Sequence, residues 1–546
     1  MAFIKVQKLV RDSNNRIVSG SASIVESVYV PGKKNHSTQR VRERLGKVIS
    51  LSEDKKSGVF LSPTRGLVEF DAVSGTFSPV SDTAKETSYS ELFPKPQIHT
   101  VFGDVFLLLR FLEKHGLLSV FQSVFPKKEE LERFLAHLLH GILKDGSHIG
   151  CDDFIEKSYA SYLFEDLILS TLHSDTIFYS MMGNDKVRMD FFKAFVRLMR
   201  RKDPKFGRGC YVDSTPLPNQ ITNNPFNALS CHGISSSQVQ TRLVLVLDEK
   251  TGLPVWYDII PGNLLDLSTI MNTINDVAAS LDIEIESLVL DAGYVCRPLI
   301  EAFHIGSGKG IISRMPARRG YPYKDLYWQF KDQFNKGKYQ FIRKDHTYFG
   351  RKKKITLFGK HEEYAYVYVD HNNALLRFRN YLEEHEEEYV AMKDKDKDWM
   401  TVKYGYFVLL SNIDTTPEDL LYRYFCRTEI ETVFKTSKEY LELLPLSKWT
   451  DQTVRGKILH DIIDTIVLLL VRKEMEAVGI STSRLFGKTQ SLMCFKNHNE
   501  EAIVEVPNKK VKEYYKLLEI SIPNYVDLKD EKHRILEKCS STFLII

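Results

Sequence analysis

The stretch "GCYVDSTPL", residues 209–217, sets the character of the middle of this chain. It is short and rich in residues that favour strands, yet it has an acidic residue, Asp213, at its centre. Burying an unpaired carboxylate costs roughly several kcal/mol, so an acid inside an apolar strand indicates a partner or a function. The residues before this stretch have a helical pattern, and strands alternate with helices after it. We therefore predict that an α/β domain begins near residue 208.

The next segments supply the rest of a sheet. "TRLVLVLDEKTGLPVWYDII" (241–260) predicts a hairpin, and "DLSTIMNTINDVAASL" (266–281) predicts a helix. "SLVLDAGY" (287–294) predicts a buried strand that ends in Asp291, followed by a helix and a further strand up to about residue 316. This order favours a mixed sheet with helices on its faces. Asp291 would then lie at the carboxyl end of a strand, where α/β sheets place ligand sites.

A third acid lies in "YFCRTEIETVFKTSK", residues 424–438, which predicts one continuous helix. At about 100° per residue, Tyr424, Arg427, Glu431 and Lys438 share one face, with Lys435 close by. An apolar arc lies beside that face, while Glu429 points the opposite way. The pattern is typical of a catalytic acid among phosphate-binding cations, and equally of surface ion pairs. The helix alone leaves both interpretations open.

Asp213, Asp291 and Glu431 together suggest a metal site. A cluster of three carboxylates repels itself unless divalent cations neutralise it, and oxygen-only ligands suit Mg²⁺ or Mn²⁺. For each acid taken singly, a strand-end cap or an ion pair is the alternative.

The order "YVDST … VLDAGY … YFCRTEIETVFKTSK" resembles the DDE transposases of prokaryotic insertion sequences. It is most similar to the branch with the signature Y-x-x-R-x-x-x-E-x-x-x-x-x-x-K. The resemblance implies a ribonuclease H-like core in which Asp213, Asp291 and Glu431 hold two Mg²⁺ ions, with Mn²⁺ as a substitute. It also implies cleavage at transposon ends, strand transfer into target DNA, and contacts from Tyr424, Arg427, Lys435 and Lys438 to DNA.

The same resemblance implies a β-rich insertion between the second and third acids, and 140 residues separate Asp291 from Glu431. Trp328 and Trp399 lie in that insertion as candidates for stacking on a DNA base, with ordinary packing as the alternative. "YPYKDLYWQF" (321–330) predicts a strand there, and "KDKDKDW" (393–399) predicts a charged loop.

The amino-terminal part is basic. Residues 1–60 hold twelve lysine and arginine residues against five acidic residues. "SASIVESVYV" and "QRVRERLGKVISL" predict strands, and Arg40, Arg42 and Arg44 alternate along the second so that they share one face. This face could lie along a DNA backbone or be an ordinary solvated surface.

These patterns predict a multi-domain α/β protein. We expect a basic β-rich DNA-binding segment (1–95), a helical domain (96–207), a catalytic core (208–317 and 406–445), a β-rich insertion (318–405) and a helical region (446–546).

The remaining composition excludes other classes. The seven cysteines are scattered without a C-x-x-C pair, which argues against a disulfide framework or a cysteine zinc site and favours a reducing cytoplasm. The longest apolar run, 462–471, contains Asp464 and is too short to cross a bilayer.

We expect a prokaryotic cytoplasmic protein at the nucleoid that binds double-stranded DNA as a homodimer. The alternatives are a related nuclease without strand transfer and a non-catalytic DNA-binding descendant of a transposase.

Overall fold

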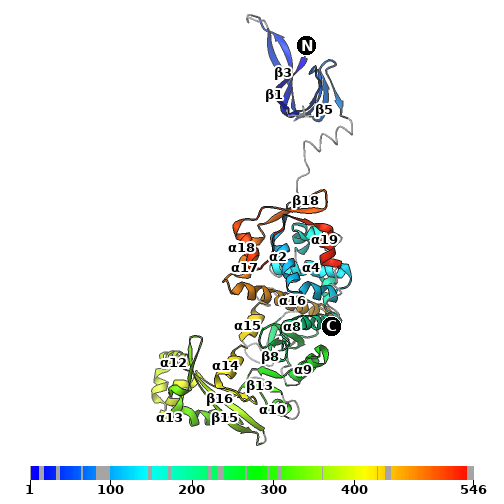
Figure 1. Ribbon diagram of the computed structural model, residues 1–546. Helices are drawn as coiled ribbons and strands as arrows, with labels where there is room; N and C mark the ends of the chain where they lie inside the picture. Colours follow the sequence, from blue (N-terminus) through cyan, green and yellow to red (C-terminus); the bar gives the residue numbers. More distant parts are fainter. Residues whose placement is uncertain are drawn as a thin grey trace. The chain divides into compact units, whose positions relative to one another are not determined.

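The computed structural model describes residues 2–11, 17–31, 37–62, 65–80, 99–144, 150–165, 167–169, 174–218, 224–229, 239–264, 267–291, 295–304, 309–359, 361–426, 428–436, 444 and 446–537. It divides into two compact units, Met1–Ile98 and His99–Ile546, which are drawn in Figure 1.

The first unit is an antiparallel meander in which each strand pairs with the next one along the chain. The strands are β1 (Ala2–Arg11), β2 (Ile17–Tyr29), β3 (Ser37–Leu51), β4 (Ser57–Ser62), β5 (Gly66–Asp71) and β6 (Thr76–Pro79). Its own small core includes Ile24, Leu45, Phe60 and Phe70. The two strands predicted from the sequence are confirmed as β2 and β3.

The predicted common face of Arg40, Arg42 and Arg44 is wrong. All three side chains are exposed, but Arg44 pairs with Ser23 while Arg40 pairs with Glu26. Ser23 and Glu26 lie three residues apart in β2 and therefore on opposite faces of the sheet. A β-bulge near Arg42 shifts the register, and such an insertion breaks the strict alternation that the sequence suggests.

The second unit begins with a helical part. Its helices are α2 (Gly103–Lys114), α3 (Leu117–Val124), α4 (Lys128–Leu143), α5 (Cys151–Glu156), α6 (Ala160–Leu163), α7 (Ser174–Met182) and α8 (Asp185–Lys202). The long helix α16 (Asp451–Glu476) packs among them and contacts α4 and α7. Figure 1 shows α16 next to the helical part that contains α4. Thr450 caps α16 through a reciprocal capping box with Thr453.

The carboxyl-terminal region is not purely helical, in contrast to our prediction. Besides α17 (Thr482–Thr489), α18 (Lys509–Leu517) and α19 (Leu528–Lys532) it contains strands β18 (Met493–Lys496), β19 (Glu501–Val504) and β20 (Tyr525–Asp527). These strands form a sheet in the order β20-β19-β18-β7, where β7 is Thr100–Val101. Since β7 and β18 lie almost 400 residues apart, no local pattern indicates this pairing.

The central sheet has the order β11-β10-β8-β12-β13-β17-β16-β15-β14. Its first half comprises β8 (Gly209–Pro218), β10 (Val239–Asp248), β11 (Pro254–Pro261), β12 (Ser287–Leu290) and β13 (Gly310–Arg314), with α9 (Leu267–Leu281) and α10 (Arg297–His304) between strands and the short β9 (Ala228–Leu229) beside β10. Strands β8, β12 and β13 run parallel, and β10 and β11 form the predicted hairpin. The alternating order of strands and helices is therefore confirmed.

Residues 318–405 add strands to the same sheet. β14 (Gln340–Arg343), β15 (His346–Leu357) and β16 (His361–Asp370) continue it beyond β17 (Tyr406–Ser411). A second hydrophobic core covers this half, and α11 (Tyr323–Phe330) and α13 (Asp394–Lys403) contribute to it. Helix α12 (His371–Ala391) contacts β15 and β16. The strand predicted at 321–330 is mostly helix, because Leu326, Tyr327 and Phe330 bury one helical face. The charged segment 393–399 begins α13 instead of a loop.

The continuous helix predicted over 424–438 is also wrong. Helix α14 spans Pro417–Phe425, a turn follows at Cys426, and α15 spans Thr428–Lys435. Tyr424 and Glu431 therefore belong to different helices, and the angles of a single helix do not relate them.

Candidate active site

Asp213 and Asp291 lie on neighbouring parallel strands. Leu290 of β12 pairs with Val212 of β8, and the same register continued by one residue sets Asp291 beside Asp213. Both side chains are partly exposed, and the carboxyl end of β12 supplies Asp291. The amide of Ser214 donates to Asp213 Oδ1 over 2.8 Å, and Ser313 Oγ donates to the backbone carbonyl of Asp291 over 3.2 Å. The sequence-predicted pair of acids is thus brought together by the sheet.

Helix α14 covers the face of the sheet on which these two acids stand. Tyr211 and Asp213 are two residues apart in β8, and Ser287 and Asp291 are four apart, so each pair shares a face. The Tyr211 hydroxyl donates to the carbonyl of Arg423 in α14 over 3.1 Å. Burial raises the pKa of Tyr211, so this hydroxyl stays protonated. The Arg423 guanidinium donates to Ser287 Oγ over 2.8 Å, which fixes α14 to the same face.

The third acid, Glu431, lies in α15, which follows α14 along the chain and contacts β8. Val433 is buried, while Glu431 and Lys435, one helical turn apart, are exposed. Tyr424, in α14, is only 6% exposed, so its ring belongs to the core. Arg427 and Lys438 lie outside the described residues.

The three acids are not gathered into one cluster in this structure. Among the residues it describes, no three or more histidine, cysteine, aspartate or glutamate side chains are grouped closely enough to hold a metal ion. The donor set nevertheless fits the expected ion, because carboxylate oxygens are the ligands that Mg²⁺ and Mn²⁺ take. Asp213 and Asp291 would be the first ligands, and Glu431 would have to approach them.

The two tryptophans of the insertion differ in their surroundings. Both flank the buried ring of Tyr327, with ring centroids 4.8 Å away for Trp328 and 4.7 Å away for Trp399. Trp399 also lines a cavity of about 530 Å³, whereas Trp328 does not. Four cations also line that cavity. Two follow β13, one lies in α11 and one in α13: Arg318, Arg319, Lys324 and Lys403.

The sequence analysis did not identify the cations at and after the end of β13 as candidate site residues. Ser313 pairs with Leu290, so one further step along β13 sets Arg314 beside Asp291. Arg314 is exposed, and the loop after it carries Arg318 and Arg319. The signal was available in the sequence, since the charged Arg314 ends β13 and the charged Asp291 directly follows β12.

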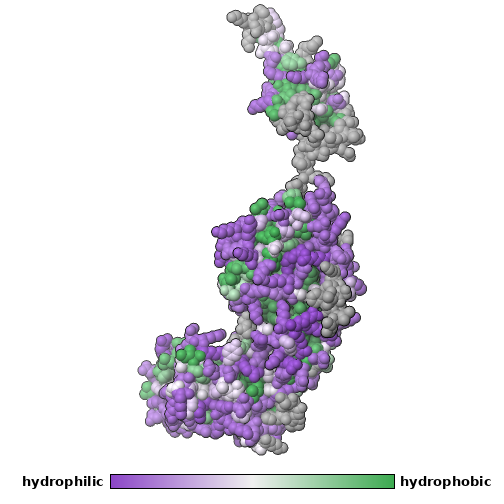
Figure 2. Space-filling model, viewed as in Figure 1, coloured by the Kyte–Doolittle hydropathy of each residue, from purple (hydrophilic) through white to green (hydrophobic). Residues whose placement is uncertain are grey.

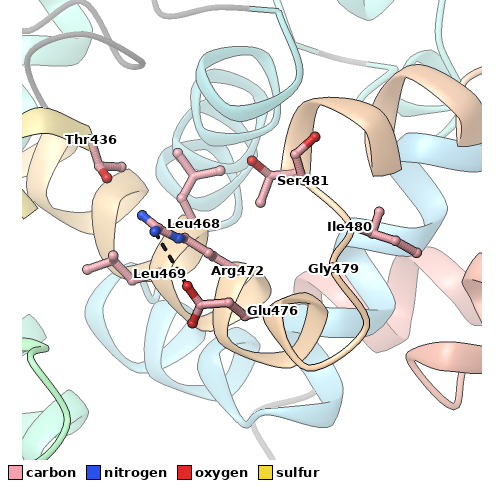
Figure 3. Close-up of a pocket in the computed structure, with 9 residues that line it drawn as sticks. Thr436, Leu468, Leu469, Arg472, Glu476, Gly479, Ile480 and Ser481 are labelled. Atoms are coloured by element: carbon pink, nitrogen blue, oxygen red, sulfur yellow. Dashed lines mark hydrogen bonds and ion pairs between the residues drawn. The ribbon is translucent and has the colours of Figure 1, made fainter. Parts of the chain in front are cut away.

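Another cavity, of about 420 Å³, lies at the carboxyl end of α15 (Figure 3). Leu468, Leu469 and Ile480 form its apolar wall, and Arg472 is 3.5 Å from Glu476 across one helical turn of α16. None of the three predicted acids lines it, so it is separate from the candidate active site.

The chain matches one known family over its middle part. Residues 204–459 match the family model described as "Transposase DDE domain". This segment contains Asp213, Asp291 and Glu431, the central sheet and the start of α16. The match supports transposase activity as the general class.

A cryo-EM structure of a piggyBac transposase synaptic complex with hairpin DNA is among the similar solved structures. It has a TM-score of 0.36 and 10% sequence identity, and the similarity covers 80% of this chain and 86% of that one. At this TM-score the two structures share too little for the likeness to define the fold. No curated protein matches the sequence.

Among the described helices, none is long and apolar enough to cross a membrane. The face of residues 99–546 seen in Figure 2 is mainly hydrophilic, with small scattered apolar patches.

Proposed function

We propose that this protein is a DNA transposase that cleaves phosphodiesters at transposon ends and transfers the strand into target DNA. The single observation that carries the proposal is the register of β8 and β12. That register joins Asp213 and Asp291 within a segment that matches the transposase DDE domain. The parallel strands β8, β12 and β13, with the antiparallel β10–β11 hairpin on one side, support a ribonuclease H-like core.

Asp213, Asp291 and Glu431 would hold the metal. Two Mg²⁺ or Mn²⁺ ions supply the positive charge that activates an attacking oxygen and stabilises a leaving 3′ oxygen. The protein's own task is to keep two carboxylates adjacent at the strand ends and to bring the third from α15. Because α15 contacts β8 and exposes Glu431, a movement of this helix towards the strand ends would complete the set.

Cations and aromatic groups around the acids would bind DNA. Lys435 is exposed one turn beyond Glu431, and the signature assigns Arg427, Lys438 and Tyr424 to phosphate groups. Tyr424 is largely buried, so a contact of this residue with a phosphate would be made through its hydroxyl. Trp399 is the better candidate for stacking on a base, because its cavity offers four cations for the phosphates beside it.

The amino-terminal unit would add binding to the DNA backbone through Arg40, Arg42 and Arg44. We further propose that two copies act together on two ends, and that the chain comes from a prokaryotic insertion sequence of the Tyr-Arg-Glu-Lys branch.

The decisive experiment uses the full-length protein and labelled DNA that flanks its own reading frame. We expect cleavage with Mg²⁺ or Mn²⁺, and joining of the cut end to a target plasmid. Asp213→Asn, Asp291→Asn and Glu431→Gln should each reduce cleavage by about 100-fold or more while DNA binding persists, because each removes a metal ligand.

Glu429→Gln is the matched control, since it removes a carboxylate from the same helix two residues away. It should retain cleavage. Full activity in any of the three acid variants would refute the site, and cleavage without joining would instead favour a nuclease that lacks strand transfer.

A further inference from the structure

One ion pair links helix α14 to the end of strand β10 and, through a shared hydrogen bond, to the start of strand β12. The Arg423 side chain in α14 makes a two-point contact with Glu249, which follows β10. Its Nε bonds Oε1 and its Nη2 bonds Oε2 at 2.8 Å. The same Nη2 donates to Ser287 Oγ at the start of β12, and Ser287 Oγ lies 3.4 Å from Glu249 Oε2. The side chains of Arg423 and Glu249 are 27% and 18% exposed, so solvent screens the pair only in part.

Strand β8 contacts Glu249 through its first residue, Gly209. The amide of Glu249 donates to the carbonyl of Gly209 over 2.8 Å. A Cβ atom at position 209 would lie 2.6 Å from Glu249 Oε2, so a side chain there would push the carboxylate away. The glycine therefore leaves the space in which the ion pair forms.

The Arg423–Glu249 pair lies away from the acids Asp213 and Asp291. Gly209 lies four residues before Asp213, and Ser287 lies four residues before Asp291. At about 3.3 Å per residue this separation is roughly 13 Å along each strand. Arg423 and Glu249 therefore do not touch a metal or substrate at the acids. They act on the position of α14, which leads directly into α15 and Glu431.

We propose that the Arg423–Glu249 pair is a positioning device that sets α14, and through it Glu431 on α15, against the strands of Asp213 and Asp291. The consequence at the metal site rests on the proposed function. That the ion pair holds α14 in place is a property of the fold alone. A two-point arginine–carboxylate pair suits this purpose because it fixes direction as well as distance.

The first test measures how firmly α14 and α15 are held and does not depend on catalytic activity. Hydrogen–deuterium exchange of the full-length protein is followed in peptides covering α14 and α15 for Glu249→Gln, Arg423→Gln and the double variant. We expect exchange there to be about 10-fold faster in each single variant, and no faster in the double variant, because both remove one interaction. Gly209→Ala should give the same result, since it displaces the carboxylate while leaving both charges in place.

The matched control is Glu531→Gln. Glu531 pairs with Arg110 in the helical part, where the two side chains are 4% and 14% exposed, and it makes no contact with α14 among the described interactions. This variant should leave exchange in α14 and α15 unchanged. Unchanged exchange in Glu249→Gln, or an equal increase in the control, would overturn the proposal.

The second test measures the consequence at the acids. Mn²⁺ is titrated into the DNA-free protein, and binding is followed by electron paramagnetic resonance. Glu249→Gln and Gly209→Ala should weaken Mn²⁺ binding by about 3- to 10-fold, whereas Glu531→Gln should not change it. Wild-type affinity in the first two variants would overturn the link to Glu431. If the wild-type protein itself binds no Mn²⁺, the proposed function fails, and the exchange experiment still decides whether the ion pair holds α14 in place.

Discussion

Asp104 shows how a single buried residue makes this fold sensitive to pH. It lies in the first turn of α2 and is 1% exposed, and burial raises its pKa to about 6. In the unfolded chain the same carboxyl group has its ordinary pKa of 3.8. Between about pH 4 and pH 6 the unfolded state therefore loses its proton first, and the free energy of unfolding falls as the pH rises.

We predict that Asp104→Asn stabilises the protein above pH 6, by up to about 3 kcal/mol, because the neutral amide never has to ionise. The gain should vanish below about pH 4, where the carboxyl group is protonated in both states. Thermal unfolding of the two proteins between pH 4 and pH 8 measures this. The exposed Asp332 is the control, since Asp332→Asn should leave the curve unchanged. A constant difference at all pH values would contradict the assignment.

At the scale of elements, the break between α14 and α15 decides where the third acid can lie. Thr428 is the first residue of α15, whereas Thr432 lies in its interior. Proline is tolerated at the first helical position, where the missing N–H has no helical partner, but inside a helix it costs about 3 kcal/mol. A single helix over 424–438 would put both threonines in its interior.

We therefore expect Thr428→Pro to lower the free energy of unfolding by less than about 1 kcal/mol and Thr432→Pro by about 3 kcal/mol. Urea unfolding of the two variants compares the same substitution at positions one turn apart. Equal losses would mean that the helix is continuous. The result also matters for function, because the break between α14 and α15 sets the direction in which α15 carries Glu431.

At the scale of the whole molecule, the two units have separate hydrophobic cores. We predict that calorimetry of the full-length protein shows two unfolding transitions, and that residues 1–98 and 99–546, produced separately, each reproduce one of them. A single cooperative transition would contradict this division.

The arginines of the first unit provide a functional test at the same scale. Replacing Arg40, Arg42 and Arg44 together by alanine should weaken DNA binding and flatten its dependence on salt, because fewer counterions are released. The transition of residues 99–546 should not shift. An unchanged salt slope would mean that these side chains, which the bulge divides between two faces, do not contact phosphate groups.

The sequence alone determined the order of strands and helices between residues 209 and 314, and it singled out Asp213 and Asp291 as candidate acids. Those features depend on local periodicity and on the high free energy of burying a lone carboxylate, which are properties of neighbouring residues. The hairpin of β10 and β11 and the strand that ends at Asp291 follow from the same rules.

Only the tertiary structure decided the features that depend on distant partners. The β-bulge at Arg42 depends on the register with β2, and the helix at Tyr323–Phe330 depends on a core that outweighs the strand preference of its aromatic residues. The pairing of β7 with β18 joins residues 394 positions apart, and the contact of Arg423 with Glu249 joins residues 174 positions apart. Such contacts follow from how the whole chain packs, because no local pattern specifies which distant side chain will lie opposite.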